Sequence, residues 1–335
     1  MSGCSCEERM RNPRVTVVVP VYNLESLIAE TLQSLIAQTY TDFEAIIIDD
    51  GSTDGSAQAI KPFLADQRFH YVFQENQKVG AARNTALRIA RGEWFALLDG
   101  DDIWLPHKLE VQIRIADSDP RINLIYGNAV AFREDGTEYV MFRSEEMREG
   151  DITAWQYERN HLAASTVMVK TEELRAVGGF EEKKLAEDYV AWLRLAQRGV
   201  WARVCRTPVA RYRIRGGSRV GDRLGNLERT IEVAEECLER EKRPKYVAIL
   251  RRSIARARGQ IGLERLRKAA MNGDPQIEKY LWEWWRADPK RVKTLIRAFL
   301  STLSARTGVD FGHRAYVERV RGMLTEREQA ESEGD

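Results

Sequence analysis

Between residues 15 and 105 the sequence alternates between short apolar runs and segments whose apolar residues recur at helical spacing. The runs are rich in β-branched and aromatic residues, and we expect buried strands at Val15–Val19, Ala45–Ile48, His70–Phe73 and Trp94–Leu98. Helices are expected in the segments between these strands. Strands and helices in this order are typical of a mostly parallel sheet with helices on both faces, so the sequence predicts an α/β fold.

The pattern changes after Pro106. Shorter strands are expected at 122–126, 130–133, 139–142 and 165–169, and an amphipathic helix is expected from Glu187 to Arg198. Beyond about residue 225 the strand signals vanish, and segments rich in Arg, Leu and Glu predict helices. We therefore predict a flexible tail at 1–13, an α/β domain at 14–224 and a helical C-terminal region at 225–335.

Composition narrows the class of protein. Of the 335 residues, 43% are hydrophobic and 31% are charged, which is ordinary for a globular chain and excludes a disordered or fibrous one. No stretch approaches the roughly 18 apolar residues of a membrane span, and the N-terminus is polar, so we expect a cytoplasmic protein. Four cysteines are too few to form a disulfide framework in a chain of this length.

The formal net charge of +1 hides a basic segment near the C-terminus. Between residues 240 and 297, 17 Lys and Arg residues face only 6 Asp and Glu. Apolar residues between 292 and 303 share one helical face, and three tryptophans lie just upstream. Such a helix can lie on an anionic membrane, so peripheral contact with the inner face of the cell membrane is expected. The alternative is that this face packs on the α/β domain or on a second copy of the chain.

Polar clusters follow three of the predicted strands: 20–23, 49–52 and 99–102. The carboxyl ends of parallel strands meet at one edge of a sheet, so these clusters should line one crevice. No glycine-rich phosphate loop is present, and Asp99, Asp101 and Asp102 crowd three carboxylates together. These oxygens favour Mg²⁺ or Mn²⁺ that bridges to a diphosphate. Alternatively, Asp101 or Asp102 caps the helix predicted after Pro106.

Five motifs together resemble the inverting glycosyltransferases of family 2, whose nucleotide-sugar-binding fold is called GT-A. They are Val17-Val18-Val19-Pro20-Val21-Tyr22-Asn23, Ile48-Asp49-Asp50-Gly51-Ser52-Thr53-Asp54, Gly80-Ala81-Ala82-Arg83-Asn84, Leu97-Leu98-Asp99-Gly100-Asp101-Asp102 and Glu187-Asp188. The resemblance covers about residues 15–218 and is absent from the C-terminal region. It implies that 14–105 binds the nucleotide sugar and that 106–224 binds the acceptor.

The resemblance also implies roles for single residues of the donor site. This site consists of residues at three strand ends and one helix: Pro20, Val21, Tyr22, Asp50, Arg83 and Asp99. The first three resemble the wall under the nucleobase, where Tyr22 can stack on an aromatic base. Asp50 resembles the acceptor for the base N–H, which implies uracil or a related pyrimidine. Arg83 resembles the cation near the base and diphosphate, and Asp99 the contact to ribose or sugar.

The reacting groups follow from the same resemblance. Asp101 resembles the ligand of a Mn²⁺ or Mg²⁺ ion. Asp188 resembles the general base that accepts the acceptor's proton, and the N-terminal dipole of its helix should keep it ionised. Arg215 stands where family members often carry a metal-binding His. Because arginine is no metal ligand, Arg215 is expected to contact the diphosphate. The acceptor pocket is expected to involve His161, Trp192 and Glu187.

We therefore predict an enzyme that moves one sugar, with inversion, from a nucleotide-diphosphate sugar to an acceptor hydroxyl. A UDP-sugar donor and a saccharide or lipid-linked saccharide acceptor are expected, in bacterial surface polysaccharide synthesis, with no nucleic-acid partner. The Gln-x-x-Arg-Trp signature of processive synthases is absent, which favours single addition. The alternatives are a metal-dependent nucleotidyl or phosphoryl transferase and a non-catalytic module that binds sugar nucleotides.

Overall fold

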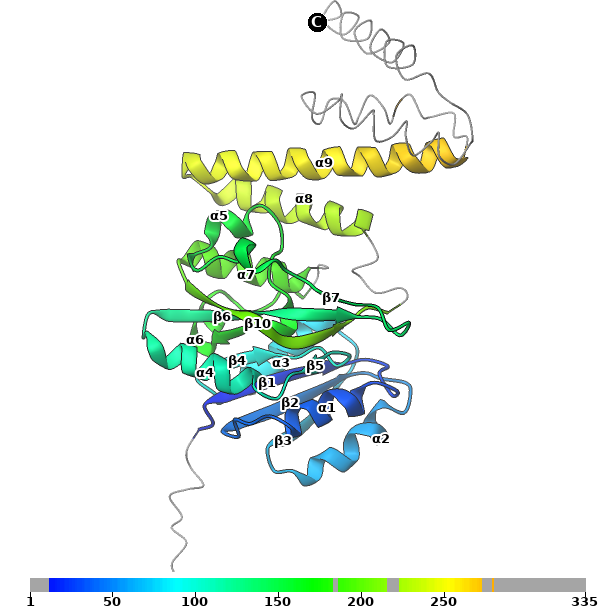
Figure 1. Cartoon of the computed structure of the whole chain (residues 1–335), viewed down its shortest axis with the longest axis vertical. Helices are drawn as coiled ribbons and strands as arrows, with labels where there is room; N and C mark the ends of the chain where they lie inside the picture. The colour runs from blue at the N-terminus through cyan, green and yellow to red at the C-terminus, as the bar shows by residue number, and fades with distance from the viewer. Residues whose placement is uncertain (1–11, 183–185, 216–222, 273–278, 280–335) are drawn as a thin grey trace, which may run out of the picture. The chain divides into compact units, whose positions relative to one another are not determined.

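The computed structural model describes residues 12–182, 186–215, 223–272 and 279 (Figure 1). Its first half contains the expected strands, seen as β1 (Val15–Val21), β2 (Phe43–Asp50), β3 (Phe69–Gln74) and β4 (Trp94–Leu97). Helices α1 (Ile28–Ile36), α2 (Ser56–Ile60) and α3 (Lys78–Ile89) alternate with them, and a 3-10 turn at Lys61–Ala65 extends α2. All three pairings within this group are parallel, as the sequence predicts.

The second half begins with β5 (Ile103–Trp104), α4 (Lys108–Ser118), β6 (Ile122–Phe132), β7 (Glu138–Val140), β8 (Gly150–Asp151) and α5 (Thr153–Gln156). It continues with β9 (Met168–Lys170), α6 (Thr171–Ala176), α7 (Glu187–Arg198) and β10 (Trp201–Arg213). Short 3-10 turns lie at Ser144–Glu146 and Ala164–Thr166. One mixed sheet results, with main strand order β3-β2-β1-β4-β9-β6-β10-β5.

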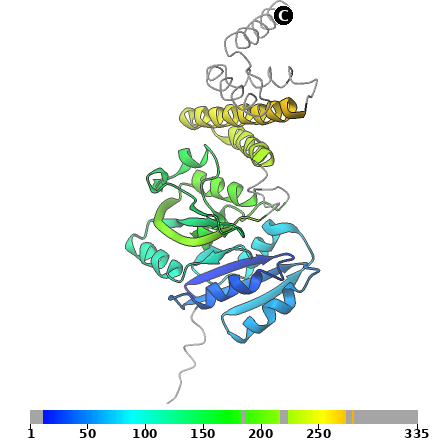
Figure 2. The same ribbon diagram turned by 45° about the vertical axis from the view of Figure 1, so that its right-hand side comes forward.

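Two apolar cores cover the two faces of this sheet. Alternate residues of β1 enter different cores, as the two-residue period of a strand requires. Helices α1 and α4 contribute to one core, for example through Leu32 and Ile113. Helices α3 and α7 contribute to the other, for example through Ala86 and Leu195. Figures 1 and 2 show α1 over the N-terminal strands and α7 beside the C-terminal ones.

The structure corrects several sequence predictions in the second half. Strands expected at 122–126 and 130–133 are one continuous strand, β6, because Gly127 packs against β10 rather than ending the strand. A Cβ at Gly127 would lie 2.4 Å from Val209 Cγ2. Strand β10, whose pairing with β6 is irregular around Pro208, was not predicted from the sequence. Of the strand expected at 165–169, the first part is a 3-10 turn.

The alternative role of Asp101 or Asp102 as a helix cap is also wrong. Strand β5 separates both residues from α4, which begins only at Lys108. The residue that precedes α4 is His107, and its side chain makes no capping hydrogen bond. The acidic cluster therefore belongs to the loop between β4 and β5. Helix capping does not explain why three carboxylates lie together there.

The chain divides into two compact units, residues 1–221 and 222–335. In the second unit the described helices are α8 (Arg223–Arg240) and α9 (Pro244–Asn272), which pack on each other. Buried residues of this unit include Val233 and Ala234 of α8 and Leu250 and Ile254 of α9. No helix in the described part of the chain is long and apolar enough to cross a membrane. The apolar face predicted at 292–303 and the tryptophans upstream lie outside the described residues.

Candidate active site

One pocket collects the polar ends of β1, β2 and β4, as the sequence predicts for a single crevice. Its lining includes seven residues predicted for the site: Pro20, Val21, Tyr22, Asp50, Asp99, Asp101 and Arg215. Gly100 lets the β4 loop approach the end of β1, since a Cβ there would lie 2.7 Å from the Pro20 carbonyl oxygen. Tyr212 and Arg213 complete the wall from β10.

The part of the pocket predicted to hold the nucleobase combines rigid and exposed groups. Pro20 and Val21 are buried in β1, whereas the Tyr22 side chain is 51% exposed and available for stacking. Asp50 is buried, and its Oδ1 accepts hydrogen bonds from Gln74 Nε2 at 2.7 Å and the Gln77 backbone N–H at 2.9 Å. Both bonds use one oxygen, so the other can accept from a ligand N–H.

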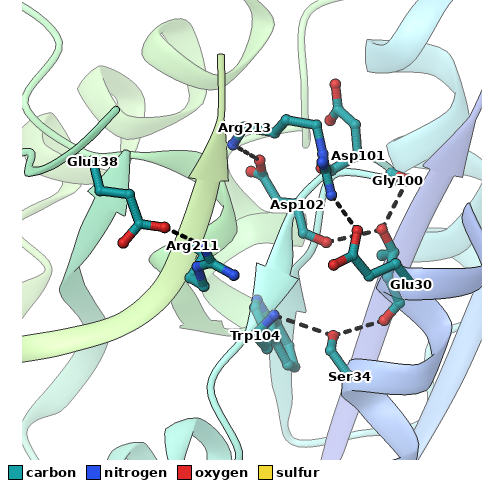
Figure 3. A network of polar contacts seen from close by, with 10 residues as sticks. Glu30, Ser34, Gly100, Asp101, Asp102, Trp104, Glu138, Arg211 and Arg213 are labelled. Carbon is teal, nitrogen blue, oxygen red and sulfur yellow. Dashed lines mark hydrogen bonds and ion pairs between the residues drawn. The ribbon is translucent and has the colours of Figure 1, made fainter. Parts of the chain in front are cut away.

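Hydrogen bonds to its backbone fix the loop that carries the acidic cluster (Figure 3). Thr31 Oγ1 donates to the carbonyl oxygens of Gly100 at 2.9 Å and Asp102 at 2.8 Å. From β10, Arg213 Nε donates to the Asp101 carbonyl oxygen at 2.9 Å, and the Arg213 guanidinium also pairs with Glu30 of α1. The loop is therefore held from both α1 and β10, which gives Asp101 a defined position at the pocket.

Each carboxylate of the cluster has its own partner within the protein. Asp99 Oδ1 lies 2.6 Å from Arg83 Nη2, and Asp101 Oδ2 lies 2.6 Å from Arg215 Nη2. Asp102 is buried and accepts from Ser165 Oγ at 2.5 Å and the Arg213 backbone N–H at 2.9 Å. Burial, with the neighbouring Asp99, raises the pKa of Asp101 and raises that of Asp102 well above its ordinary value.

The predicted metal depends on Asp101. Among the described residues, no group of three or more His, Cys, Asp or Glu side chains is arranged to hold a metal ion. Asp102 is directed inward to Ser165, which leaves Asp101 as the carboxylate that lines the pocket next to Asp99. Mg²⁺ and related ions often bind through one carboxylate while substrate phosphates and water complete the shell. The residues fit that mode and do not fit a closed protein cage.

Arg83 does not lie where its predicted role requires. Its side chain is 2% exposed and it is not among the residues that line the pocket. The guanidinium instead bridges Asp99 and Glu187, with Nη1 3.0 Å from Glu187 Oε1. Gly80 permits this close approach, because a Cβ there would lie 2.1 Å from the Glu181 carbonyl oxygen, before α7, and 3.3 Å from Glu187 Cβ at the start of α7. In this structure Arg83 therefore forms a bridge between Asp99 of the pocket and Glu187 of α7, and its contact with a base or diphosphate stays a prediction.

Asp188 lies in the first turn of α7, next to that bridge. Its side chain is partly buried, and Oδ2 lies 3.3 Å from Asn160 Nδ2. Burial and the neighbouring Glu187 raise the pKa of Asp188 to about 6, although Arg83 acts in the opposite direction. A carboxyl group with this pKa is still mostly ionised at neutral pH, as predicted from the helix dipole, and becomes protonated as the pH falls through about 6. A pKa near 6 suits a group that accepts a proton at neutral pH.

The three residues expected in the acceptor pocket are all buried. Glu187 is 3% exposed and paired with Arg83. Trp192 belongs to the apolar core, edge-on to Phe180. His161 stacks on Trp155 at 4.1 Å between ring centroids, and burial lowers its pKa to about 3. The apolar pattern of α7 explains Trp192. None of the three side chains is therefore exposed on a surface that an acceptor could contact.

Other residues that shape the site were missed by the sequence analysis. Thr31, Ser165 and Asn160 contact the cluster or Asp188 from sites 28 to 71 residues away in the sequence. Sequence patterns carry no signal for such contacts. The described residues also include three non-glycine residues with positive φ, Asn23 (53°), Lys78 (72°) and Ala186 (83°). Each adjoins a site residue, and backbone strain of this kind is concentrated at functional sites.

Residues 16–172 match the model of the family "Glycosyl transferase family 2". TuaG of Bacillus subtilis, a glycosyltransferase named for teichuronic acid biosynthesis, is 30% identical over 60% of this chain and 79% of its own length. The Escherichia coli glucosyltransferase WfaP, named UDP-Glc:alpha-D-GlcNAc-diphosphoundecaprenol beta-1,3-glucosyltransferase, is 29% identical over 65% of this chain and 84% of its own length.

Solved structures show the same fold. Staphylococcus aureus TarS with UDP-GlcNAc has a TM-score of 0.62 and 20% identity over 95% of this chain and 92% of that chain. A Pyrobaculum calidifontis mannosyltransferase with GDP-Man and Mn²⁺ has a TM-score of 0.60 and 20% identity, and the match covers 94% of this chain and 86% of that chain. The chain spans 65% of an uncharacterized Methanocaldococcus jannaschii glycosyltransferase and 30–36% of three longer Rickettsia relatives. From its family match and its relatives, the chain belongs to glycosyltransferase family 2 and has the GT-A fold.

Proposed function

We propose that this chain transfers one sugar from a UDP-sugar to an acceptor hydroxyl with inversion, in the synthesis of a bacterial surface glycan. One observation carries the proposal: the donor pocket and Asp188 are joined through the buried Asp99–Arg83–Glu187 bridge. A nucleotide site and a carboxylate with a pKa near 6 are thereby held in fixed relation. The names of WfaP and TarS, with UDP-Glc and UDP-GlcNAc, support UDP as the nucleotide.

The proposed mechanism gives each residue a separate task. Tyr22 stacks on the uracil, and the free oxygen of Asp50 accepts from its N–H. Asp101 would hold a Mn²⁺ or Mg²⁺ ion together with the donor diphosphate, and such an ion would supply Lewis-acid stabilisation of the charge on the departing diphosphate. Asp188 accepts the proton of the acceptor hydroxyl while the hydroxyl oxygen attacks the anomeric carbon of the sugar. The bond from that carbon to the diphosphate breaks on the opposite side, and this displacement inverts the configuration.

The experiment that tests this function measures the released product. The full chain is incubated with Mn²⁺ and, in turn, UDP-glucose, UDP-GlcNAc and GDP-mannose, with a lipid-linked GlcNAc diphosphate as acceptor. Release of UDP with a glycosylated acceptor is expected. Pyrophosphate release would favour the alternative nucleotidyl transferase, and nucleotide binding without turnover would favour a non-catalytic module. Binding is measured in parallel by thermal shift, with and without Mn²⁺.

Replacement of Asp101 by Ala is expected to lower metal-dependent transfer by roughly 10²–10³-fold, because Lewis-acid stabilisation contributes several kcal/mol. The melting temperature should stay the same or rise. Burial and Asp99 raise the pKa of Asp101, which means that its charged form is disfavoured in the fold. Asp135→Ala, in an exposed turn, is the matched control for loss of one carboxylate. Near-normal sugar transfer by Asp101→Ala would refute the proposal that Asp101 is a metal ligand.

We also propose that the second unit contacts anionic lipid, near a lipid-linked acceptor. Helix α9 exposes Lys245, Arg251, Arg252 and Arg256, and within the described chain none of them has an acidic partner. Glutamates of α8 pair with other cations, such as Arg258. Four unneutralised cations on one helix attract an anionic surface. The WfaP name, which contains a diphosphoundecaprenol acceptor, supports this location.

Flotation with phosphatidylglycerol vesicles tests this contact. Wild-type protein is expected to float at low salt and to be released at high salt, because screening weakens the attraction. The triple variant Arg251→Gln, Arg252→Gln, Arg256→Gln should lose most of the floating fraction. A control with Arg88, Arg114 and Arg133 changed to Gln removes the same charge from exposed sites of the first unit. Equal flotation of the two triple variants would refute a role for α9.

A further inference from the structure

The carboxylates of the acidic cluster are neutralised by the protein itself. Three close carboxylates first pointed to a metal ion, yet each has a partner from this chain: Arg83 for Asp99, Arg215 for Asp101, and Ser165 with a backbone N–H for Asp102. The cluster can therefore form before any cation binds. The three pairings differ in whether a ligand can reach the partner as well as the carboxylate.

Among the residues that the structure describes, Asp99 and Asp101 both line the pocket, but only in the Asp101–Arg215 pair does the cationic partner line it too. The Arg83 guanidinium and the Asp102 carboxylate are buried, 2% and 1% exposed. The Asp101 side chain is 21% exposed and that of Arg215 is 40% exposed, and both residues line the pocket. Arg213 also lines it, but its guanidinium is committed to Glu30 and to the Asp101 carbonyl oxygen. An incoming ligand can thus separate Arg215 from Asp101 without disturbing the buried pairs.

We propose that Arg215 occupies the Asp101 carboxylate in the ligand-free protein and competes there with a divalent cation. On donor binding Arg215 leaves Asp101 to the cation and pairs with the diphosphate. The inference rests on the proposed function, which supplies the nucleotide-sugar donor. The 2.6 Å ion pair between Arg215 and Asp101 is the state before the donor binds. A guanidinium cannot ligate a metal, but its planar set of donors matches phosphate oxygens. The exchange replaces the Asp101–Arg215 ion pair by two interactions, one between Asp101 and the cation and one between Arg215 and the diphosphate.

The exchange has a direct consequence for cation affinity in the absence of nucleotide. A cation that binds Asp101 must first displace a guanidinium, so the ion pair weakens cation binding. A partly exposed pair contributes about 1 kcal/mol, and its removal should tighten Mn²⁺ binding roughly fivefold. With saturating Mn²⁺ the same substitution should weaken UDP binding, because the diphosphate loses a cationic partner. A residue with a merely structural role would not shift the two affinities in opposite directions.

The experiment titrates Mn²⁺ into nucleotide-free protein, with free Mn²⁺ measured by electron paramagnetic resonance. It compares wild type, Arg215→Gln and Arg215→Lys, and UDP affinity at saturating Mn²⁺ follows by calorimetry. We expect roughly fivefold tighter Mn²⁺ binding and roughly tenfold weaker UDP binding for Arg215→Gln, with Arg215→Lys between it and wild type. Arg211→Gln is the matched control, since Arg211 lies in β10 four positions before Arg215, pairs with Glu138 and lies outside the pocket lining.

Unchanged or weaker Mn²⁺ binding by Arg215→Gln would overturn the competition, even if the wild type transfers sugar. An equal gain in Mn²⁺ affinity for Arg211→Gln would also overturn it, because the effect would then be one of net charge. If Arg215→Gln tightens Mn²⁺ binding but the wild type binds no UDP, the competition is supported and the proposed donor is refuted. The nucleotide-free titration thus separates failure of this inference from failure of the proposed function.

Discussion

Asp188→Asn is expected to lower sugar transfer by roughly 10²–10⁴-fold, the usual contribution of a positioned general base. The amide keeps the size of the side chain and can accept the Tyr189 backbone N–H that now reaches Oδ1, but it cannot take a proton. UDP affinity should hardly change, because Asp188 does not line the donor pocket. The measurement is single-turnover transfer at saturating donor, with UDP affinity determined for the same preparation.

The pH dependence of this reaction is a second test of Asp188 as the general base. The pKa of Asp188 is raised to about 6, so the carboxylate is protonated below that pH and available as a base above it. Wild-type kcat/KM should therefore rise with pH through about 6, and this acidic limb should vanish in Asp188→Asn. Asp135→Asn, which removes a charge in an exposed turn, should keep rate and pH profile. Full activity of Asp188→Asn would leave Asp188 as only the start of α7.

The N-terminal half of the fold could be predicted because its signals are local. Each strand there is a short apolar run, and each polar cluster follows its strand directly, as with Asp49-Asp50 after the core of β2. Parallel pairing then brings the strand ends to one edge, which is why the predicted pocket residues meet. The motifs and the topology point to the same place.

The partners of these residues could not be predicted, because they are contributed by distant segments. Arg83 meets Glu187 from 104 positions away, and Arg213 meets Asp102 from 111 positions away. The strand that carries Arg213 was missed, since Pro208 interrupts its apolar pattern and the pairing with β6 is irregular there. Without these partners the cluster looks like unneutralised charge, and Arg83 looks like a ligand for phosphate. Burial, which no local pattern reports, decides both.

The buried bridge leads to the second large effect. Arg83→Met is expected to destabilise the first unit by about 3–5 kcal/mol, since it removes the buried cation that pairs with the Glu187 and Asp99 carboxylates. Glu187 is 3% exposed and Asp99 partly buried, and the guanidinium also lies over the Phe180 ring at 5.4 Å. Methionine keeps much of the packing volume, so the loss reflects charge rather than a cavity. Urea unfolding measures it, with Arg88→Met on the exposed side of α3 as the control.

A double variant separates the charge effect from loss of packing. Glu187→Gln in the Arg83→Met background removes the buried negative charge that has lost Arg83 and should restore part of the lost stability, whereas Glu187→Gln alone should destabilise. Absence of any rescue by Glu187→Gln would mean that Arg83 stabilises the unit by packing alone.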